Sequence, residues 1–263
     1  MKEERLPVKI WYILYPFLFY YAVMLCVMTV LQWIFGTGKE HYVQCQMVSS
    51  IITVFFMLPF YRQDAALSGK KKEKPSLIKE KLFHVLAAVV ITVCIGTALN
   101  NMISMTPLVE MSEGYQEANE GFYGSTLAFE LVSSAVFTPV LEELVFRGII
   151  FTRLKNMMAR YTAAVLSALI FAVIHFNIVQ FIYALLIGIL LAVLMECAGN
   201  MYAAVAGHMA VNALAVLRTE TGLLAQTVTG NVFSWSVSVV LLAVGLILLF
   251  LYVFYLKNTR KIV

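Results

Sequence analysis

Six polar residues lie inside stretches of the chain that are otherwise strongly apolar, and their types could support acid–base chemistry. They are Glu142, Glu143, Arg147, His175, His208 and Asn212. The first three carry the only charges between Leu131 and Phe151. A charge at the centre of a lipid bilayer costs about 2.5–3.5 kcal/mol on insertion scales. Such residues are therefore expected to face a polar interior, where they find partners.

The spacing of these residues divides them into roles. Glu143 and Arg147 are four residues apart, so a helix places them on one face as an ion pair. Glu142 then points about a quarter-turn away and stays free. His208 and Asn212 are also four apart and project toward one point. A free carboxylate beside an imidazole can take a proton from water, and N–H groups can stabilise an oxyanion. The set predicts amide hydrolysis; the alternative is that the charged residues only hold helices together.

A zinc site is a second chemical possibility, because two histidines and a carboxylate form a known catalytic ligand set. Its ligands would be Glu142, His175 and His208. However, the sequence lacks the H-E-x-x-H pattern that gives many metalloproteases two ligands on one helix. We therefore expect no cofactor and keep zinc as the alternative.

The composition predicts an all-α, multi-pass membrane protein. Of the 263 residues, 61% are hydrophobic and 13% are charged. Soluble domains have about half of their residues apolar and about a quarter charged. The net charge of +4 comes from basic residues between apolar runs, so no nucleic-acid partner is expected. The four cysteines form no C-x-x-C pattern, which argues against a disulfide framework or a zinc ribbon.

About eight transmembrane helices are expected, since a span needs about 20 apolar residues. The expected spans are Ile10–Phe35, Tyr42–Tyr61, Leu82–Ile103, Thr126–Phe151, Ala163–Phe176, Ile178–Cys197, Met201–Leu217 and Val232–Tyr255. The first is too long for the apolar region of a cleavable signal peptide, so it should be retained. Together they form a single membrane domain, residues 1–263, with a polar active-site cavity and a catalytic core at about 126–217.

The orientation follows from the Lys and Arg residues of the short loops, which collect on the cytosolic side. With eight spans, all basic segments, including the one with Arg153, fall on one side, and both termini should be cytosolic. The acidic connection Met105–Gly124 should lie outside, as a lid or as a flexible connector. The Lys70–Lys81 segment should contact anionic lipid headgroups. Glu130 and His84 lie near span edges, where we expect both to be hydrated.

Three motifs occur in order on successive apolar helices, between about Phe129 and Leu217. They are Glu142-Glu143-x-x-x-Arg147, Phe171-x-x-x-His175 and His208-x-x-x-Asn212. In this order the motifs resemble the CAAX-protease and bacteriocin-processing-enzyme family, also called CPBP or Abi. Gly148 and Gly188 fit the usual form of that family. The resemblance implies an intramembrane endopeptidase with an eight-helix fold.

The resemblance also implies a role for each site residue. Glu142 and His175 would activate the water, while His208 and Asn212 would stabilise the oxyanion. The remaining two, Glu143 and Arg147, would support the site. The family was long described as metal-dependent, yet its better-studied members look like glutamate proteases without a bound metal. A metal-free glutamic endopeptidase is therefore the expectation.

Two other functions compete with the peptidase. One is a non-catalytic membrane scaffold that regulates a partner such as a sensor kinase, and the other is a transporter with a Glu/His proton relay. Paired halves with interrupted helices, common in transporters, are not visible in the sequence. The expected substrate is a membrane-associated peptide or protein cleaved near its terminus. If the Met-rich chain comes from a bacterial cell membrane, as we expect, bacteriocin or pheromone precursors are the favoured substrates. The sequence does not indicate an oligomeric state.

Overall fold

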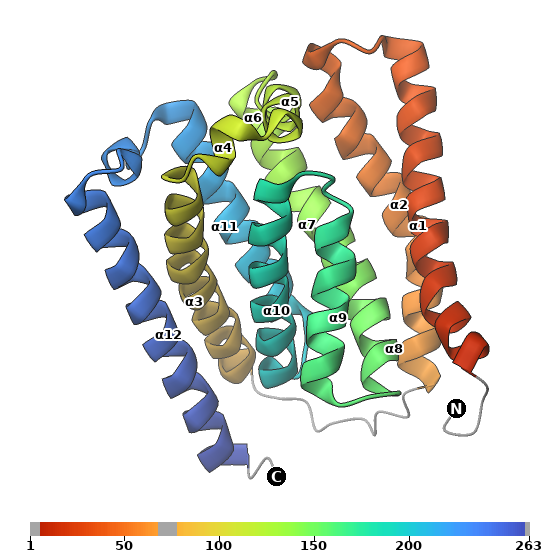
Figure 1. The fold of residues 1–263 in the computed structure, drawn as a ribbon. Coiled ribbons are helices and arrows are strands. Elements are labelled where there is room, and N and C mark those ends of the chain that lie inside the picture. The colour runs from red at the N-terminus through yellow and green to blue at the C-terminus, as the bar shows by residue number, and fades with distance from the viewer. Residues whose placement is uncertain (1–5, 68–77, 261–263) are drawn as a thin grey trace.

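The computed structural model describes residues 6–67 and 78–260, and within these ranges every regular element is helical. The helices run alongside one another, and α1 begins at the same end of the bundle where α12 finishes (Figure 1). The short helices α4 and α5 lie at the opposite end. The predicted class, an all-α polytopic membrane protein, is confirmed.

Six of the described helices are long and apolar enough to cross a membrane. They are α1 (Leu6–Phe35), α2 (Lys39–Leu67), α3 (Ile78–Ser104), α10 (Ile178–Ala198), α11 (Met201–Thr221) and α12 (Val232–Arg260). Each coincides with an expected span and extends beyond it at one end or both. The seventh apolar helix, α9 (Arg160–Val173), has only 14 residues. The count of eight spans therefore stays a prediction.

The helix that carries the three charged site residues is interrupted by two π-helical segments. Its successive parts are α6 (Leu127–Val132), η1 (Ser133–Phe137), α7 (Thr138–Glu143), η2 (Leu144–Phe151) and α8 (Thr152–Lys155). The segments η1 and η2 are π-helical, with hydrogen bonds from i to i+5, a pattern found frequently at functional sites. Every residue of η2 is buried. This composite helix thus lies inside the bundle, with η2 packed against α1, α2, α9, α10 and α11.

A tight turn at His175–Asn177 joins α9 to α10, as the sequence predicts. The side chain of Asn177 caps α10 by accepting a 2.9 Å hydrogen bond from the backbone N–H of Gln180. The two helices approach closely, because a Cβ placed on Gly188 would lie 2.9 Å from the Cβ of Ala168. The turn therefore holds His175 at a defined place at the end of α9.

The acidic connection between α3 and α6 forms α4 (Leu108–Met111) and α5 (Glu113–Phe122). Its carboxyl end is held against the start of α2 by three contacts. The rings of Phe122 and Tyr42 lie 5.6 Å apart, Gln44 donates a 2.9 Å hydrogen bond to the Ser125 hydroxyl, and Lys39 pairs with Glu120. The connection is thus helical and docked.

The sequence had suggested that Arg153 lies in a loop, and this expectation is wrong. Arg153 belongs to α8 and is 1% exposed. Its Nε donates to Oδ2 of Asp64 at 2.6 Å, and its Nη1 donates to the backbone carbonyl of Tyr12 at 2.6 Å. A basic side chain predicted to face the cytosol instead joins α8 to α1 and α2.

The expected hydration of Glu130 and His84 is also wrong. Glu130 is fully buried and accepts a 3.1 Å hydrogen bond from the backbone N–H of Ser125. His84 is 4% exposed, and its Nδ1 lies 2.8 Å from the hydroxyl of Tyr252. Both residues are covered because the packed helices continue past the ends of the apolar runs. Most of the Lys70–Lys81 segment lies outside the described residues.

Candidate active site

The predicted ion pair between Glu143 and Arg147 is present and fully enclosed. Nη1 of Arg147 donates to Oε1 of Glu143 at 2.8 Å, and both side chains are 0% exposed. The guanidinium carbon lies 4.7 Å from the centre of the Phe171 ring. A cation over an aromatic face is favourable, more so when it is desolvated. The pair therefore has both an ionic and an aromatic partner inside the bundle.

Gly188 on α10 leaves the room that the guanidinium needs. A Cβ at this position would lie 3.1 Å from Nη2 of Arg147. Gly148, on the composite helix itself, allows Tyr61 and Met201 to pack closely. A Cβ at this position would lie 3.0 Å from the Tyr61 ring and 3.2 Å from the Met201 sulfur. Gly188 is thus explained by close packing against Arg147, and Gly148 by close packing against Tyr61 and Met201.

His208 from α11 lies between the two carboxylates. Its Nδ1 lies 2.8 Å from Oε1 of Glu143, and its Nε2 lies 3.6 Å from Oε2 of Glu142. A carboxylate only accepts hydrogen bonds, so Nδ1 carries the proton and donates it. The longer distance is beyond hydrogen-bond range. Nε2 therefore faces Glu142 without being bonded to it.

His175 is held by its own helix. Its Nδ1 lies 3.0 Å from the carbonyl oxygen of Phe171, which must accept, so Nδ1 is the donor and Nε2 is left for chemistry. The Phe171 ring makes edge contacts with both histidine rings, at 5.0 Å to His175 and 6.1 Å to His208. Among the basic side chains of the described residues, only His208 has a nitrogen within 4.0 Å of the Glu142 carboxylate. Phe171 is thus the physical link between the two histidines.

Asn212 faces the composite helix from one turn further along α11. Its Nδ2 donates a 2.9 Å hydrogen bond to the backbone carbonyl of Ser134 in η1. The amide therefore keeps one N–H and its oxygen for another partner. Helix α11, which carries Asn212, packs closely against α3, because a Cβ on Gly207 would lie 2.6 Å from the hydroxyl of Thr92.

Burial separates the six predicted residues into two groups. Glu143 and Arg147 are completely enclosed, and the His208 side chain is 7% exposed. Glu142, with a side chain 14% exposed, is partly accessible, as are His175 and Asn212. The arrangement is an enclosed charged support beside a partly open set of a carboxylate, an imidazole and an amide. Such a set can move protons and donate hydrogen bonds to a substrate.

Comparison with known protein families identifies the part of the chain that carries this site. Residues 124–214 match the model of a family described as Type II CAAX prenyl endopeptidase Rce1-like. This segment is Rce1-like. The resemblance to the CPBP family is thereby confirmed, and the match supports a protease. None of the curated proteins and none of the solved structures compared with the chain matches it.

All six predicted residues fall inside the Rce1-like segment, yet helix α1 outside it also contributes to the surroundings of the site. Tyr20 is 6% exposed, and its ring makes an edge contact at 5.9 Å with Phe146, the neighbour of Arg147. Phe17 packs 6.4 Å from the same ring. Our sequence analysis did not assign α1 to the site; its many aromatic residues were the available signal.

Phe176, directly after His175, is a second feature that sequence reasoning missed. Its φ angle is +55°, in the left-handed region, and its side chain is 75% exposed. The residue that ends a helix in this conformation is usually glycine, and for other residues the conformation costs roughly 1–2 kcal/mol. The signal was the short turn itself, which needs a left-handed residue between α9 and the cap of α10.

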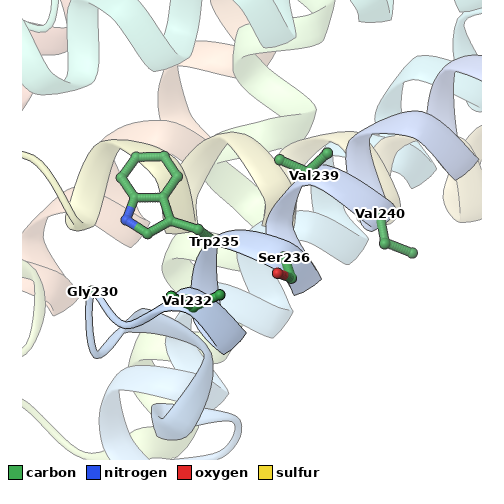
Figure 2. A pocket seen from close by; sticks show the side chains of 6 residues that line it. All are labelled: Gly230, Val232, Trp235, Ser236, Val239 and Val240. Carbon is green, nitrogen blue, oxygen red and sulfur yellow. The ribbon is translucent and has the colours of Figure 1, made fainter.

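No group of three metal-binding side chains is arranged to hold an ion among residues 6–67 and 78–260. The zinc set of Glu142, His175 and His208 stays an alternative that metal analysis of the purified protein can test. An open apolar depression occurs elsewhere, on α12, lined by Val232, Trp235 and Val239 among others (Figure 2). None of the six site residues lines it.

Proposed function

We propose that the protein is an intramembrane endopeptidase that hydrolyses a membrane-associated peptide or protein with a water activated by Glu142 and His175. The observation that carries this proposal is the position of Glu142. Its partly exposed carboxylate makes no hydrogen bond within the described residues and faces Nε2 of His208 at 3.6 Å. A carboxylate kept free beside a donor is what a water-activating base requires.

In this mechanism Glu142 takes a proton from the attacking water. His175 presents an unprotonated Nε2, because its Nδ1 proton is directed to the Phe171 carbonyl. This nitrogen can orient the water or pass a proton to the leaving amine. The two residues come from different helices and both are partly accessible, so a substrate peptide could lie between them.

The oxyanion is stabilised by His208 and Asn212. His208 uses Nδ1 on Glu143, which leaves Nε2–H of the imidazolium directed toward the reacting region. This role requires a proton on Nε2 as well, since Nδ1–H is already directed to Glu143. The free N–H of Asn212 is the second donor. Preorganised donors of this kind give a large part of the rate enhancement in acyl transfer.

The test is kcat for cleavage of a fluorogenic peptide by single variants, compared at equal amounts of folded protein. We expect Glu142→Gln to fall to background, since the water loses its base. Asn212→Ala should lose about 10²–10³-fold in kcat with little change in KM, as expected for one oxyanion donor. His208→Ala should resemble Asn212→Ala. The control is Thr219→Ala, an exposed residue on the same helix whose hydroxyl donates a hydrogen bond to the backbone carbonyl of Ala215.

Near wild-type cleavage by Glu142→Gln would overturn the proposal. A non-catalytic scaffold would give another result, in which the wild-type protein cleaves nothing and Glu142→Gln retains all partners. The comparison therefore separates the enzyme from the scaffold as well as the base from the oxyanion donors.

A further inference from the structure

Phe176 combines two properties that rarely occur together in a folded protein. It adopts a left-handed backbone conformation that a bulky residue avoids, and it leaves three quarters of its surface exposed. Since the ring has little packing to compensate the backbone strain, stability does not explain the residue. Strained residues cluster at functional sites, where the surrounding structure holds them.

The surroundings fix Phe176 in this position. Asn177 directly after it caps α10, and the Asn177 Nδ2 donates at 3.0 Å to the carbonyl of His175 directly before it. Helix α5 lies against the turn, because a Cβ on Gly114 would be 3.5 Å from the Asn177 Cβ and 3.7 Å from the carbonyl oxygen of Phe176. The ring is therefore presented in a defined direction.

The ring of Phe176 is directed toward α1. Its centre lies 6.4 Å from the ring of Tyr21, which stacks on Phe17 at 6.4 Å. Phe17 in turn contacts Phe146, next to Arg147. An aromatic surface thus runs from the residue after His175, across α1, to the helix of Glu142. Phe176 and Tyr21 are its accessible end, since Tyr21 is also partly exposed.

We propose that Phe176 and Tyr21 form a binding subsite for an apolar side chain of the substrate peptide, next to the scissile bond. This inference rests on the proposed function, because it concerns the specificity of that same site. The strained turn presents an aromatic ring at the residue directly after His175, where glycine would present none. Aromatic rings give a large apolar contact area at a low cost in side-chain entropy, which suits them to this task.

The test measures kcat/KM for two fluorogenic peptides that carry Leu or Ala at one position flanking the scissile bond, scanned over both sides. We expect the wild-type enzyme to favour one Leu peptide by about tenfold or more, the discrimination typical of a hydrophobic pocket. Phe176→Gly should reduce that ratio to about twofold, mainly through KM. Phe176→Tyr should preserve the ratio, and Phe176→Asn, which tolerates the left-handed region, should behave like Phe176→Gly.

The unfolding midpoint in detergent distinguishes specificity from structure. Phe176→Gly should unfold at the same temperature as the wild-type protein or higher, because glycine adopts the turn without strain. The matched control is Leu224→Gly, which relieves the other non-glycine left-handed residue in the described chain and should leave the ratio unchanged. An unchanged Leu/Ala ratio in Phe176→Gly, or an equal loss of kcat on both peptides, would overturn the subsite. Failure of the proposed function looks different, since the wild-type protein would then cleave neither peptide.

Discussion

His208 and Glu143 meet at the oxygen that Arg147 also uses: Nδ1 of the histidine and Nη1 of the arginine both lie 2.8 Å from Oε1 of Glu143. Two helices are therefore joined through one enclosed carboxylate. Oε2 of Glu143, and Nε and Nη2 of Arg147, have no hydrogen-bond partner among the described residues. The stability of the pair depends on this single shared oxygen and on the Phe171 ring.

Arg147→Ala should destabilise the protein more than Glu142→Gln does. Removing the arginine leaves Glu143 as an enclosed charge without its cation, and breaking a buried pair costs about 3–5 kcal/mol. Glu142 loses no hydrogen bond on substitution. The measurement is the free energy of unfolding in mixed detergent. Glu143→Gln combined with Arg147→Ala should recover part of the loss, and equal stability of the two single variants would contradict the expectation.

Gly188→Ala should also lower stability, by about 1–3 kcal/mol, because an added methyl group overpacks the bundle. Its Cβ would meet the Ala168 Cβ at 2.9 Å and Nη2 of Arg147 at 3.1 Å. Gly114→Ala is the control, since its closest neighbour would be 3.5 Å away. If both variants unfold at the same temperature, the packing of α9, α10 and Arg147 differs from that described.

Treatment with a metal chelator should leave the rate of peptide cleavage unchanged. In the proposed mechanism the water is activated by Glu142 and His175, so purified enzyme should contain no stoichiometric zinc, and treatment with a chelator should not change kcat. Elemental analysis and activity before and after chelation provide the measurement. One zinc per chain, lost in both His175→Ala and His208→Ala, would instead favour the ligand set of two histidines and Glu142.

The orientation predicted from the basic residues can be measured by cysteine labelling in a background without the four native cysteines. Glu117→Cys, on exposed α5, should react with a membrane-impermeant maleimide in intact cells. Lys257→Cys, near the end of α12, should react only after the cells are opened. The reverse pattern would place both termini outside.

Much of the site follows from sequence because its determinants are local or repeat along a helix. The Glu143–Arg147 pair depends on a four-residue spacing that can be read from the sequence. The left-handed conformation of Phe176 was missed, because no glycine marks the turn. The π-helical segments were not predictable in this way, because apolar composition does not encode whether a hydrogen bond runs to i+4 or i+5. The contact between Arg153 and Asp64 was also missed, since the two residues lie 89 positions apart.

The catalytic roles depend on finer geometry than spacing can give. The four-residue spacing places His208 and Asn212 on one face of α11, but it does not show that the first contacts Glu143 and that the second is anchored on the Ser134 carbonyl. The hydrogen bond between His175 and the Phe171 carbonyl could be predicted only if the end of α9 were known to within a residue or two. Boundaries of this precision come from packing, not from hydropathy.

The local character of the Glu143–Arg147 pair has a consequence for membrane insertion. Both charges belong to one helix, so they can neutralise each other while that helix leaves the ribosome and enters the bilayer, before His208 has been synthesised. Without Arg147, the Glu143 carboxylate would have no partner in the bilayer until His208 on α11 is made. The pair thus allows the composite helix to enter the bilayer before α11 is made, and the contact of His208 with Glu143 forms later.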